Sequence, residues 1–205
     1  MSKTLSGVIA AVATPIDESG APDLKRATDL ARHLLDNGCD GLNVLGSTGE
    51  ATSFSRDERK SVMDAYKSNG LPLDRLMVGT GAASVSDAIA LTRHAAELGF
   101  AGALVLPPFY YKGVTDDGLV NYIDALVSAT KDSALPIYLY HYPQLTGIPW
   151  HVELIKRLRK TFPSRIVGLK DSSGDMAFAR SAAAVAPDFA VFPSTEACLL
   201  DARKG

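Results

Sequence analysis

Alternating strand-like and helix-like segments predict an α/β protein of the (β/α)8, or TIM, barrel class. Apolar runs alternate with helical segments along the whole chain, which is typical of successive βαβ units. The runs are almost continuously apolar, as in parallel strands that helices cover. Polar residues follow several of these strands. They favour a barrel, whose site collects on the carboxyl-end loops, over a doubly wound sheet of the same rhythm.

The first element, Val8–Thr14, resembles the apolar part of a signal peptide, but Pro15 closes it and later runs repeat its pattern. We therefore interpret it as the first buried strand. Bounded apolar runs of the same kind predict all seven strands, which are Val8–Thr14, Gly41–Leu45, Leu76–Gly79, Ala103–Leu106, Ile137–Tyr140, Ile166–Lys170 and Phe189–Phe192.

The segments between these strands are predicted to be helices. Two of them are followed by glycine, Gly38 and Gly99, the residue type that most easily adopts the left-handed conformation at a helix end. The predicted helices are Leu24–Asn37, Ser55–Ser68, Ser84–Leu98, Asp117–Lys131, His151–Lys160 and Met176–Val185.

Residues 1–205 are predicted to form a single barrel domain, because no low-complexity linker interrupts the units. The barrel is expected to be truncated before its eighth strand, with the C-terminal strand and helices missing. The first and seventh strands would then have open edges. Either the sequence is a fragment, or the eighth strand is supplied in another way.

The amino-acid composition of the chain argues against several classes of binding partner. The chain has a net charge of −2 and is 46% hydrophobic, with no basic stripe, so neither nucleic acid nor an anionic membrane is an expected partner. No apolar stretch is long enough to cross a bilayer. Cys39 and Cys198 form no motif, which favours a reducing, cytoplasmic location. The four histidines lack metal-ligand spacing, so no metal is expected.

Lys170 ends an apolar strand and is the first candidate for catalysis. Strand alternation places Ile166 and Gly168 on its face, and Gly168 is expected to leave space for a substrate beside the amine. An amine removed from water loses its proton more easily and can then attack a carbonyl. The alternative is an ordinary strand-end lysine that forms a salt bridge with Asp171 or Asp175.

A loop of two hydroxyl residues between glycines, Gly46–Glu50, follows the second strand. Ser47 and Thr48 are suited to bind a small carboxylate through backbone N–H and hydroxyl groups. An ordinary capping turn explains the same residues. Asn43, on the preceding strand, is expected to face inward.

Two aromatic clusters follow later strands. The loop Pro107–Tyr111 suits either a pocket wall or a subunit contact, and plain core packing is the alternative. Tyr140 lies at the end of the strand next to the Lys170 strand and is suited to transfer protons. His141 is expected to point to the opposite face and to have a structural role.

Taken together, the motifs resemble the dihydrodipicolinate synthase / N-acetylneuraminate lyase family. They are Gly-Ser-Thr-Gly-Glu after the second strand, Tyr-x-x-Pro-x-x-Thr-Gly at Tyr140–Gly147, and Gly-Leu-Lys-Asp-Ser-Ser-Gly-Asp at Gly168–Asp175. The resemblance implies an eight-stranded barrel that binds pyruvate as a lysine Schiff base. It makes Lys170 the imine-forming residue, with no other cofactor. Members are usually homotetramers.

By position in these motifs, the resemblance implies that Tyr140 is the proton-shuttling tyrosine. It also implies that Ser47 and Thr48 hold the pyruvate carboxylate. Tyr110 resembles the tyrosine that members insert into a neighbouring subunit's site, with Tyr111 as the second choice.

The resemblance is incomplete at the positions that bind the second substrate in members of the family. Synthases have an arginine where this chain has Leu145, and leucine resembles the lyase and sugar-acid branches. Glu196 lies where those branches can place an acid that accepts hydrogen bonds from substrate hydroxyls. Ala197 stands where a second acid of the sialic-acid pattern is expected.

The resemblance therefore predicts a class I lyase or aldolase that forms or cleaves carbon–carbon bonds of 2-keto acids, with pyruvate as the common fragment. A 2-keto-3-deoxy sugar acid is the favoured substrate. Dihydrodipicolinate synthesis and dehydration of a keto-deoxy sugar acid are the alternatives within this chemistry. A non-catalytic fragment or binding protein is the alternative outside it.

Overall fold

The computed structural model describes residues 5–193, which contain a single curved sheet of seven parallel strands. The strands pair in sequence order, β1 to β7, with no reversal of order. A doubly wound sheet has a switch point in its strand order, and this sheet has none, so the barrel class is confirmed. The strands are β1 (Ile9–Ala11), β2 (Gly41–Val44), β3 (Leu76–Gly79), β4 (Gly102–Val105), β5 (Ile137–His141), β6 (Ile166–Asp171) and β7 (Ala190–Pro193).

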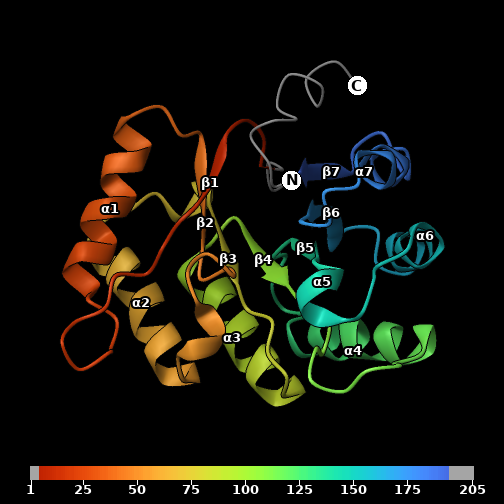
Figure 1. Ribbon diagram of the computed structural model, residues 1–205, viewed down its shortest axis with the longest axis horizontal. Helices are drawn as coiled ribbons and strands as arrows, with labels where there is room; N and C mark the ends of the chain where they lie inside the picture. Colours follow the sequence, from red (N-terminus) through yellow and green to blue (C-terminus); the bar gives the residue numbers. More distant parts are fainter. Residues whose placement is uncertain (1–4, 194–205) are drawn as a thin grey trace.

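Helices follow the strands and lie outside the curved sheet (Figure 1). Each predicted helix is present, with ends within two residues of those expected. Along the chain, one short 3-10 turn precedes α2, η1 (Ala51–Ser53), and another follows it, η2 (Leu73–Arg75). The helices are α1 (Leu24–Asp36), α2 (Arg56–Ser68), α3 (Val85–Leu98), α4 (Asp116–Ala129), α5 (Pro143–Thr146), α6 (Val152–Thr161) and α7 (Met176–Ala183). None of the helices within residues 5–193 is long and apolar enough to cross a membrane.

The entry to α2 shows why this helix begins where it does. Ser55 and Glu58 form a capping box, in which each side chain bonds to the other residue's backbone N–H. This arrangement satisfies donors that the first turn of a helix otherwise leaves unpaired. Glu50, at the end of the hydroxyl loop, precedes η1 and forms no side-chain cap.

Two apolar clusters fill the two sides of the sheet. The larger one packs the strands against the helices and includes Leu42, Val44 and Leu169. The smaller one fills the inside of the curve and includes Met77, Tyr138 and others. Asn43, between Leu42 and Val44, faces inward as expected, because strand neighbours alternate in direction.

Strand β6 departs from simple alternation. Its register with β5 shifts after Ile166, so Ile137 pairs with Ile166 but Tyr138 pairs with Gly168. Ile166 consequently packs in the outer cluster with Leu169, and Val167 contacts the inner cluster. The expectation that Ile166 shares the face of Lys170 is therefore wrong.

The first strand is shorter than expected, Ile9–Ala11 instead of Val8–Thr14. Val8 is 51% exposed and precedes the pairing with β2. Within the described sheet, β1 and β7 each have one neighbour, so both have an open edge, as predicted.

Candidate active site

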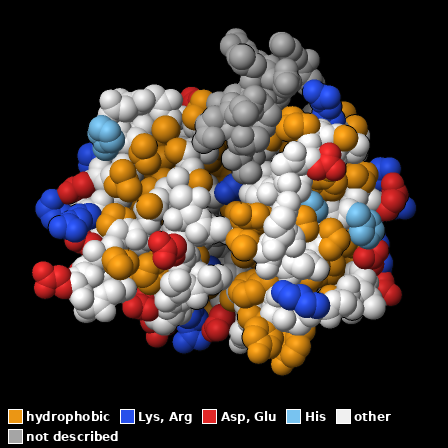
Figure 2. Space-filling model, viewed as in Figure 1, with side chains coloured by type: hydrophobic (Ala, Val, Ile, Leu, Met, Phe, Trp, Pro, Cys, Tyr) orange, Lys and Arg blue, Asp and Glu red, His pale blue; other side chains and the backbone are white. Residues whose placement is uncertain are grey.

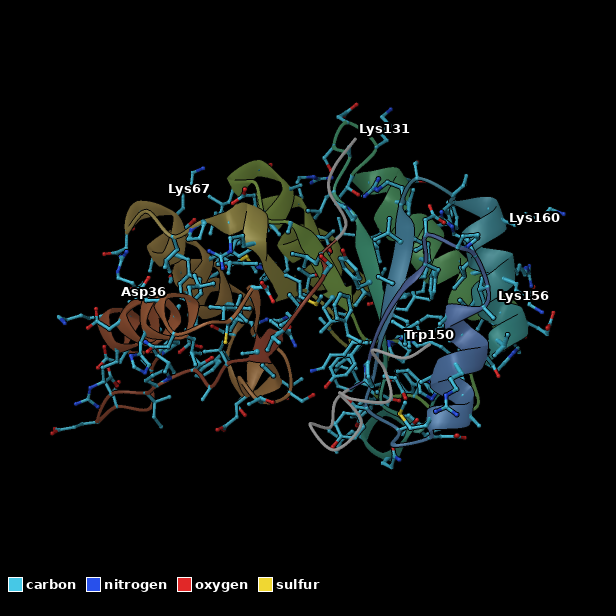
Figure 3. The ribbon with its side chains drawn as sticks, turned by 90° about the horizontal axis from the view of Figure 1, so that it is seen from above. Asp36, Lys67, Lys131, Trp150, Lys156 and Lys160 are labelled. Atoms are coloured by element: carbon cyan, nitrogen blue, oxygen red, sulfur yellow. The ribbon has the colours of Figure 1, made fainter. Side chains whose placement is uncertain are left out.

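Lys170 lies near the end of β6 and is 8% exposed. Its Nζ atom is 4.7 Å from the ring centroid of Tyr140, the residue that pairs with it on β5. By contrast, lysines on the helices and loops, such as Lys67 and Lys156, point outward to solvent (Figure 3). Lys170 is thus a buried amine over a tyrosine ring, unlike a surface lysine.

The two aspartates near Lys170 have other roles. Asp171 accepts a hydrogen bond from the backbone of Ser173 at 2.9 Å. Asp175 caps α7 by accepting from the first residues of that helix. Within residues 5–193, no carboxylate forms a salt bridge with Lys170, which argues against the alternative of a strand-end ion pair.

Tyr140 joins the lysine to the hydroxyl loop after β2. Its hydroxyl donates a hydrogen bond to Oγ of Ser47 at 3.2 Å, across 93 residues of sequence. Ser47 is partly buried, whereas Thr48 beside it is exposed. The structure therefore brings Lys170, Tyr140 and Ser47 together, and places Thr48 on the outer side of the same loop.

The backbone of this loop has a conformation that few residues adopt. Leu45 has a φ of 53° and is 1% exposed. A left-handed conformation at a non-glycine residue typically costs about 1–3 kcal/mol and persists only where the surroundings fix it. Here the carbonyl of Leu45 lies directly against Gly79 of β3, where a Cβ atom would be 1.9 Å from the oxygen. The neighbouring strand thus holds the turn that presents Ser47.

Gly168 makes room for a protein side chain. A Cβ atom there would lie 2.8 Å from Cδ1 of Tyr138 and 2.4 Å from the carbonyl oxygen of Ala190. The ring of Tyr138 is fully buried, and its hydroxyl accepts a hydrogen bond from the backbone N–H of Leu5 at 3.0 Å. The expected space beside Gly168 is therefore filled by Tyr138, and a role of Gly168 in substrate binding stays a prediction.

Tyr110 and Tyr111 lie on the loop between β4 and α4. They are 71% and 78% exposed and pack edge to face, with ring centroids 5.1 Å apart. Hydrophobic side chains gather along the lower edge of the face shown in Figure 2, where Figure 1 has this loop. Among the described residues, neither tyrosine forms a hydrogen bond or cation–π contact with Lys170, whose amine lies over the ring of Tyr140 instead.

The family resemblance assigns Leu145 and Glu196 to the choice of the second substrate, and only Leu145 is among the described residues. Leu145 lies on the short helix α5 and is 62% exposed. Glu196, like Ala197 beside it, lies outside the described residues, so its role stays a prediction.

His141 packs away from the site, as predicted. It is 5% exposed, its Nδ1 atom accepts from the backbone N–H of Trp150 at 3.1 Å, and its ring stacks on Phe178. Trp150 is labelled in Figure 3 among the side chains next to the sheet. Burial lowers the pKa of His141, which favours the neutral ring that this hydrogen bond requires.

Arg59 is a residue of this region that sequence analysis missed. It lies on α2, is 4% exposed and lines the same small cavity as Ser47 and Tyr140. The signal was present in the sequence, since Arg59 shares its helical spacing with the apolar Val62 and Tyr66. An arginine in an apolar stripe indicates a buried charge.

Known proteins resemble the chain over nearly its whole length. A model of the dihydrodipicolinate synthetase family matches residues 4–204. An uncharacterised DapA-like lyase of Chloroflexus aurantiacus is 34% identical over 200 residues, 97% of this chain and 66% of that protein. Dihydrodipicolinate synthase from Agrobacterium tumefaciens has a TM-score of 0.92 and 32% identity, covering 97% of this chain and 69% of that one. A 2-keto 3-deoxygluconate aldolase from Picrophilus torridus has a TM-score of 0.86 and 27% identity, covering 97% and 70%.

The chain spans 66% of the length of the lyase from Chloroflexus and 54% of the length of several other curated relatives. The matched part includes the lysine strand, the tyrosine strand and the hydroxyl loop described above. Because the family's model matches almost every residue and the fold agrees, the chain belongs to the dihydrodipicolinate synthetase family.

Proposed function

We propose that the protein is a class I lyase or aldolase that binds 2-keto acids as an imine on Lys170. The observation that carries the proposal is the buried amine over the ring of Tyr140, whose hydroxyl reaches Ser47. A buried amine next to a group that can transfer protons is the arrangement that imine formation needs. The similarity to proteins named as synthases and aldolases supports the same class of chemistry.

In the proposed reaction, the free amine of Lys170 attacks the C2 ketone carbon of the substrate. Tyr140 gives its proton to the ketone oxygen, which takes a second proton from the attacking amine and leaves as water, so a protonated imine and the phenolate of Tyr140 remain. The phenolate takes the proton of the C4 hydroxyl while the imine accepts the electron pair of the breaking C3–C4 bond, so an aldehyde leaves and a pyruvate enamine remains. Protonation at C3 and hydrolysis then release pyruvate and restore the amine. The reverse sequence adds the enamine to an aldehyde.

The carboxylate of the keto acid is assigned to the loop after β2. Ser47 and Thr48 offer hydroxyl groups there, and the strained turn at Leu45 fixes their position in advance. No metal or further cofactor is proposed for this reaction.

Borohydride trapping tests the imine. Reduction of the full-length protein in the presence of pyruvate is expected to attach one pyruvate-derived group to Lys170, located by intact-mass and peptide analysis. Lys170→Ala is expected to remove the label, and Lys156→Ala, at an exposed lysine of α6, is the matched control that keeps it. A label that survives Lys170→Ala contradicts the proposal.

The aldehyde partner is proposed to be a neutral or polyhydroxylated aldehyde, derived from a 2-keto-3-deoxy sugar acid. Leu145 offers neither charge nor hydrogen-bond donor to a second carboxylate, whereas a charge-assisted hydrogen bond typically contributes about 1.5–3 kcal/mol. The similarity to a 2-keto 3-deoxygluconate aldolase supports this substrate class. Dehydration of a 2-keto-3-deoxy sugar acid is an alternative reaction for the same substrate class, because it begins with the same imine.

Dihydrodipicolinate synthesis is the second candidate, because several curated relatives at 37–38% identity are 4-hydroxy-tetrahydrodipicolinate synthases. The two candidates differ in kcat/KM for condensation of pyruvate with aspartate semialdehyde and for cleavage of 2-keto-3-deoxy acids. We expect cleavage to be the more efficient. Efficient condensation together with no cleavage would assign the protein to the synthases.

A further inference from the structure

Arg59 holds the end of β3 from behind the hydroxyl loop. Its Nη2 atom donates hydrogen bonds to the carbonyl oxygen of Gly79 at 2.8 Å and to that of Gly81 at 3.2 Å. Both oxygens are the negative ends of peptide dipoles, and Gly79 is the residue against which the carbonyl of Leu45 packs. A continuous set of contacts therefore leads from the guanidinium through β3 to the turn that carries Ser47.

The charge of Arg59 has no paired carboxylate in the part of the chain that the structure describes. Asp87, the acidic residue whose charge is felt at Arg59, forms its salt bridge with Arg56 at 3.2 Å. The buried Nε atom of Arg59 has no hydrogen-bond partner. Burial lowers the pKa of Arg59 to about 10, so the group is still a cation at neutral pH. An uncompensated buried cation is unfavourable unless an anion comes close to it.

The cavity between Arg59, Ser47 and Tyr140 has a volume of about 20 Å³. This space holds about one water molecule and is too small for a keto acid. Arg59 therefore does not touch a substrate bound at Lys170. It can act on one through its electric field, which is screened weakly in a buried site, and through the carbonyl groups that it binds.

We infer that Arg59 is a positioning residue that selects carbonyl compounds bearing a carboxylate. It supplies the positive field behind the hydroxyl loop and neutralises the carbonyl dipoles of Gly79 and Gly81, which would otherwise repel an anion. This inference rests on the proposed imine chemistry at Lys170, and it adds a residue of α2 to the determinants of substrate choice.

The test compares two ketones that differ in charge, pyruvate and its uncharged amide, pyruvamide. For each, the concentration that gives half-maximal borohydride trapping at Lys170 is measured in the full-length protein. Arg59→Gln removes the charge but keeps donors for the carbonyl groups, and Arg59→Lys keeps the charge. Arg56→Gln, which removes an exposed charge one turn earlier on α2, is the matched control.

Arg59→Gln is expected to raise the half-maximal pyruvate concentration about tenfold or more and to change that of pyruvamide less than about twofold. Arg59→Lys and Arg56→Gln are expected to keep the wild-type ratio of the half-maximal pyruvate concentration to the half-maximal pyruvamide concentration. If circular dichroism shows that Arg59→Gln does not fold, Arg59→Met, which fills the space of the arginine stem, takes its place.

Three outcomes are distinguishable. An equal change for both ketones in Arg59→Gln, or no change for either, leaves the ratio of their half-maximal concentrations unchanged and overturns the inference. Absence of trapping in the wild-type protein with either ketone overturns the proposed function itself. A loss confined to pyruvate supports the inference.

Discussion

Tyr140 and His141 are adjacent in the sequence, yet their side chains lie on opposite faces of β5. Tyr140 faces the inside of the curved sheet with Lys170, and His141 packs between the sheet and the helices. A strand thus separates two titratable groups by direction alone. His141, which points outward, already accepts a hydrogen bond from the backbone N–H of Trp150. Tyr140, which points inward, is therefore the candidate for proton transfer.

Tyr140→Phe is expected to slow both trapping and turnover about 10²–10⁴-fold, the usual effect of losing a positioned acid–base group. The ring remains, so the packing over Lys170 and the melting temperature should change little. Single-turnover trapping rates with pyruvate and a thermal melt measure the two effects. Tyr142→Phe, on the ring that neighbours Tyr140, is the matched control. A trapping rate equal to that of the wild-type protein would make Tyr140 only a wall of the site.

The register shift of strand β6 decides which of its side chains face the site. After the shift, Gly168 lies opposite Tyr138, and Lys170 lies opposite Tyr140. The missing side chain at Gly168 lets the ring of Tyr138 pack against the backbone. A buried ring thus supports the strand one layer below the lysine.

Gly168→Ala is expected to lower the free energy of unfolding by about 1–3 kcal/mol, because the new methyl group would overlap Tyr138 and the carbonyl of Ala190. Urea unfolding of the full-length protein measures the change. Gly118→Ala in α4 is the control, since a Cβ there would lie 3.0 Å from Cγ1 of Val114 and 3.4 Å from Oγ1 of Thr115, with no backbone atom as close as at Gly168, and alanine favours a helix. Unchanged stability with loss of trapping would instead assign Gly168 to substrate binding.

Tyr110 and Tyr111 form an exposed aromatic pair on the loop between β4 and α4. Two large aromatic side chains that are more than two thirds exposed are typical of an interaction surface. We therefore propose that the full-length protein is a homotetramer in which this loop meets a second subunit, and that Tyr110 contributes to the neighbour's site.

Mixed oligomers test this arrangement. Tyr110→Phe and Lys170→Ala subunits are each expected to have little activity alone. Co-assembled, they should regain activity, because a site with an intact Lys170 then receives an intact Tyr110 from its partner. Tyr111→Phe mixed with Lys170→Ala is the control for the second choice of tyrosine. Mixtures that never exceed the sum of their parts, or a fully active monomer by light scattering, contradict the prediction.

The order of strands and helices, the lysine strand and the hydroxyl loop could all be predicted from the sequence. These features are local, since apolar periodicity, turn residues and short motifs are written in neighbouring residues. The same is true of the direction of His141, which depends only on alternation from Tyr140. The first strand was predicted too long because its apolar run continues beyond the residues that pair with β2.

Other features were decided only in the tertiary structure. Ile166 turned outward and Gly168 was filled by Tyr138, because both depend on a register shift against β5 that β6 alone does not encode. Arg59 entered the site region because it reaches Gly79, 20 residues away, across the packing of α2 on β3. The physical reason is common to all three. In an unbroken element, periodicity fixes which way a side chain points, but a register shift reverses that direction at Ile166. What each side chain meets is set by register and packing between elements far apart in the chain.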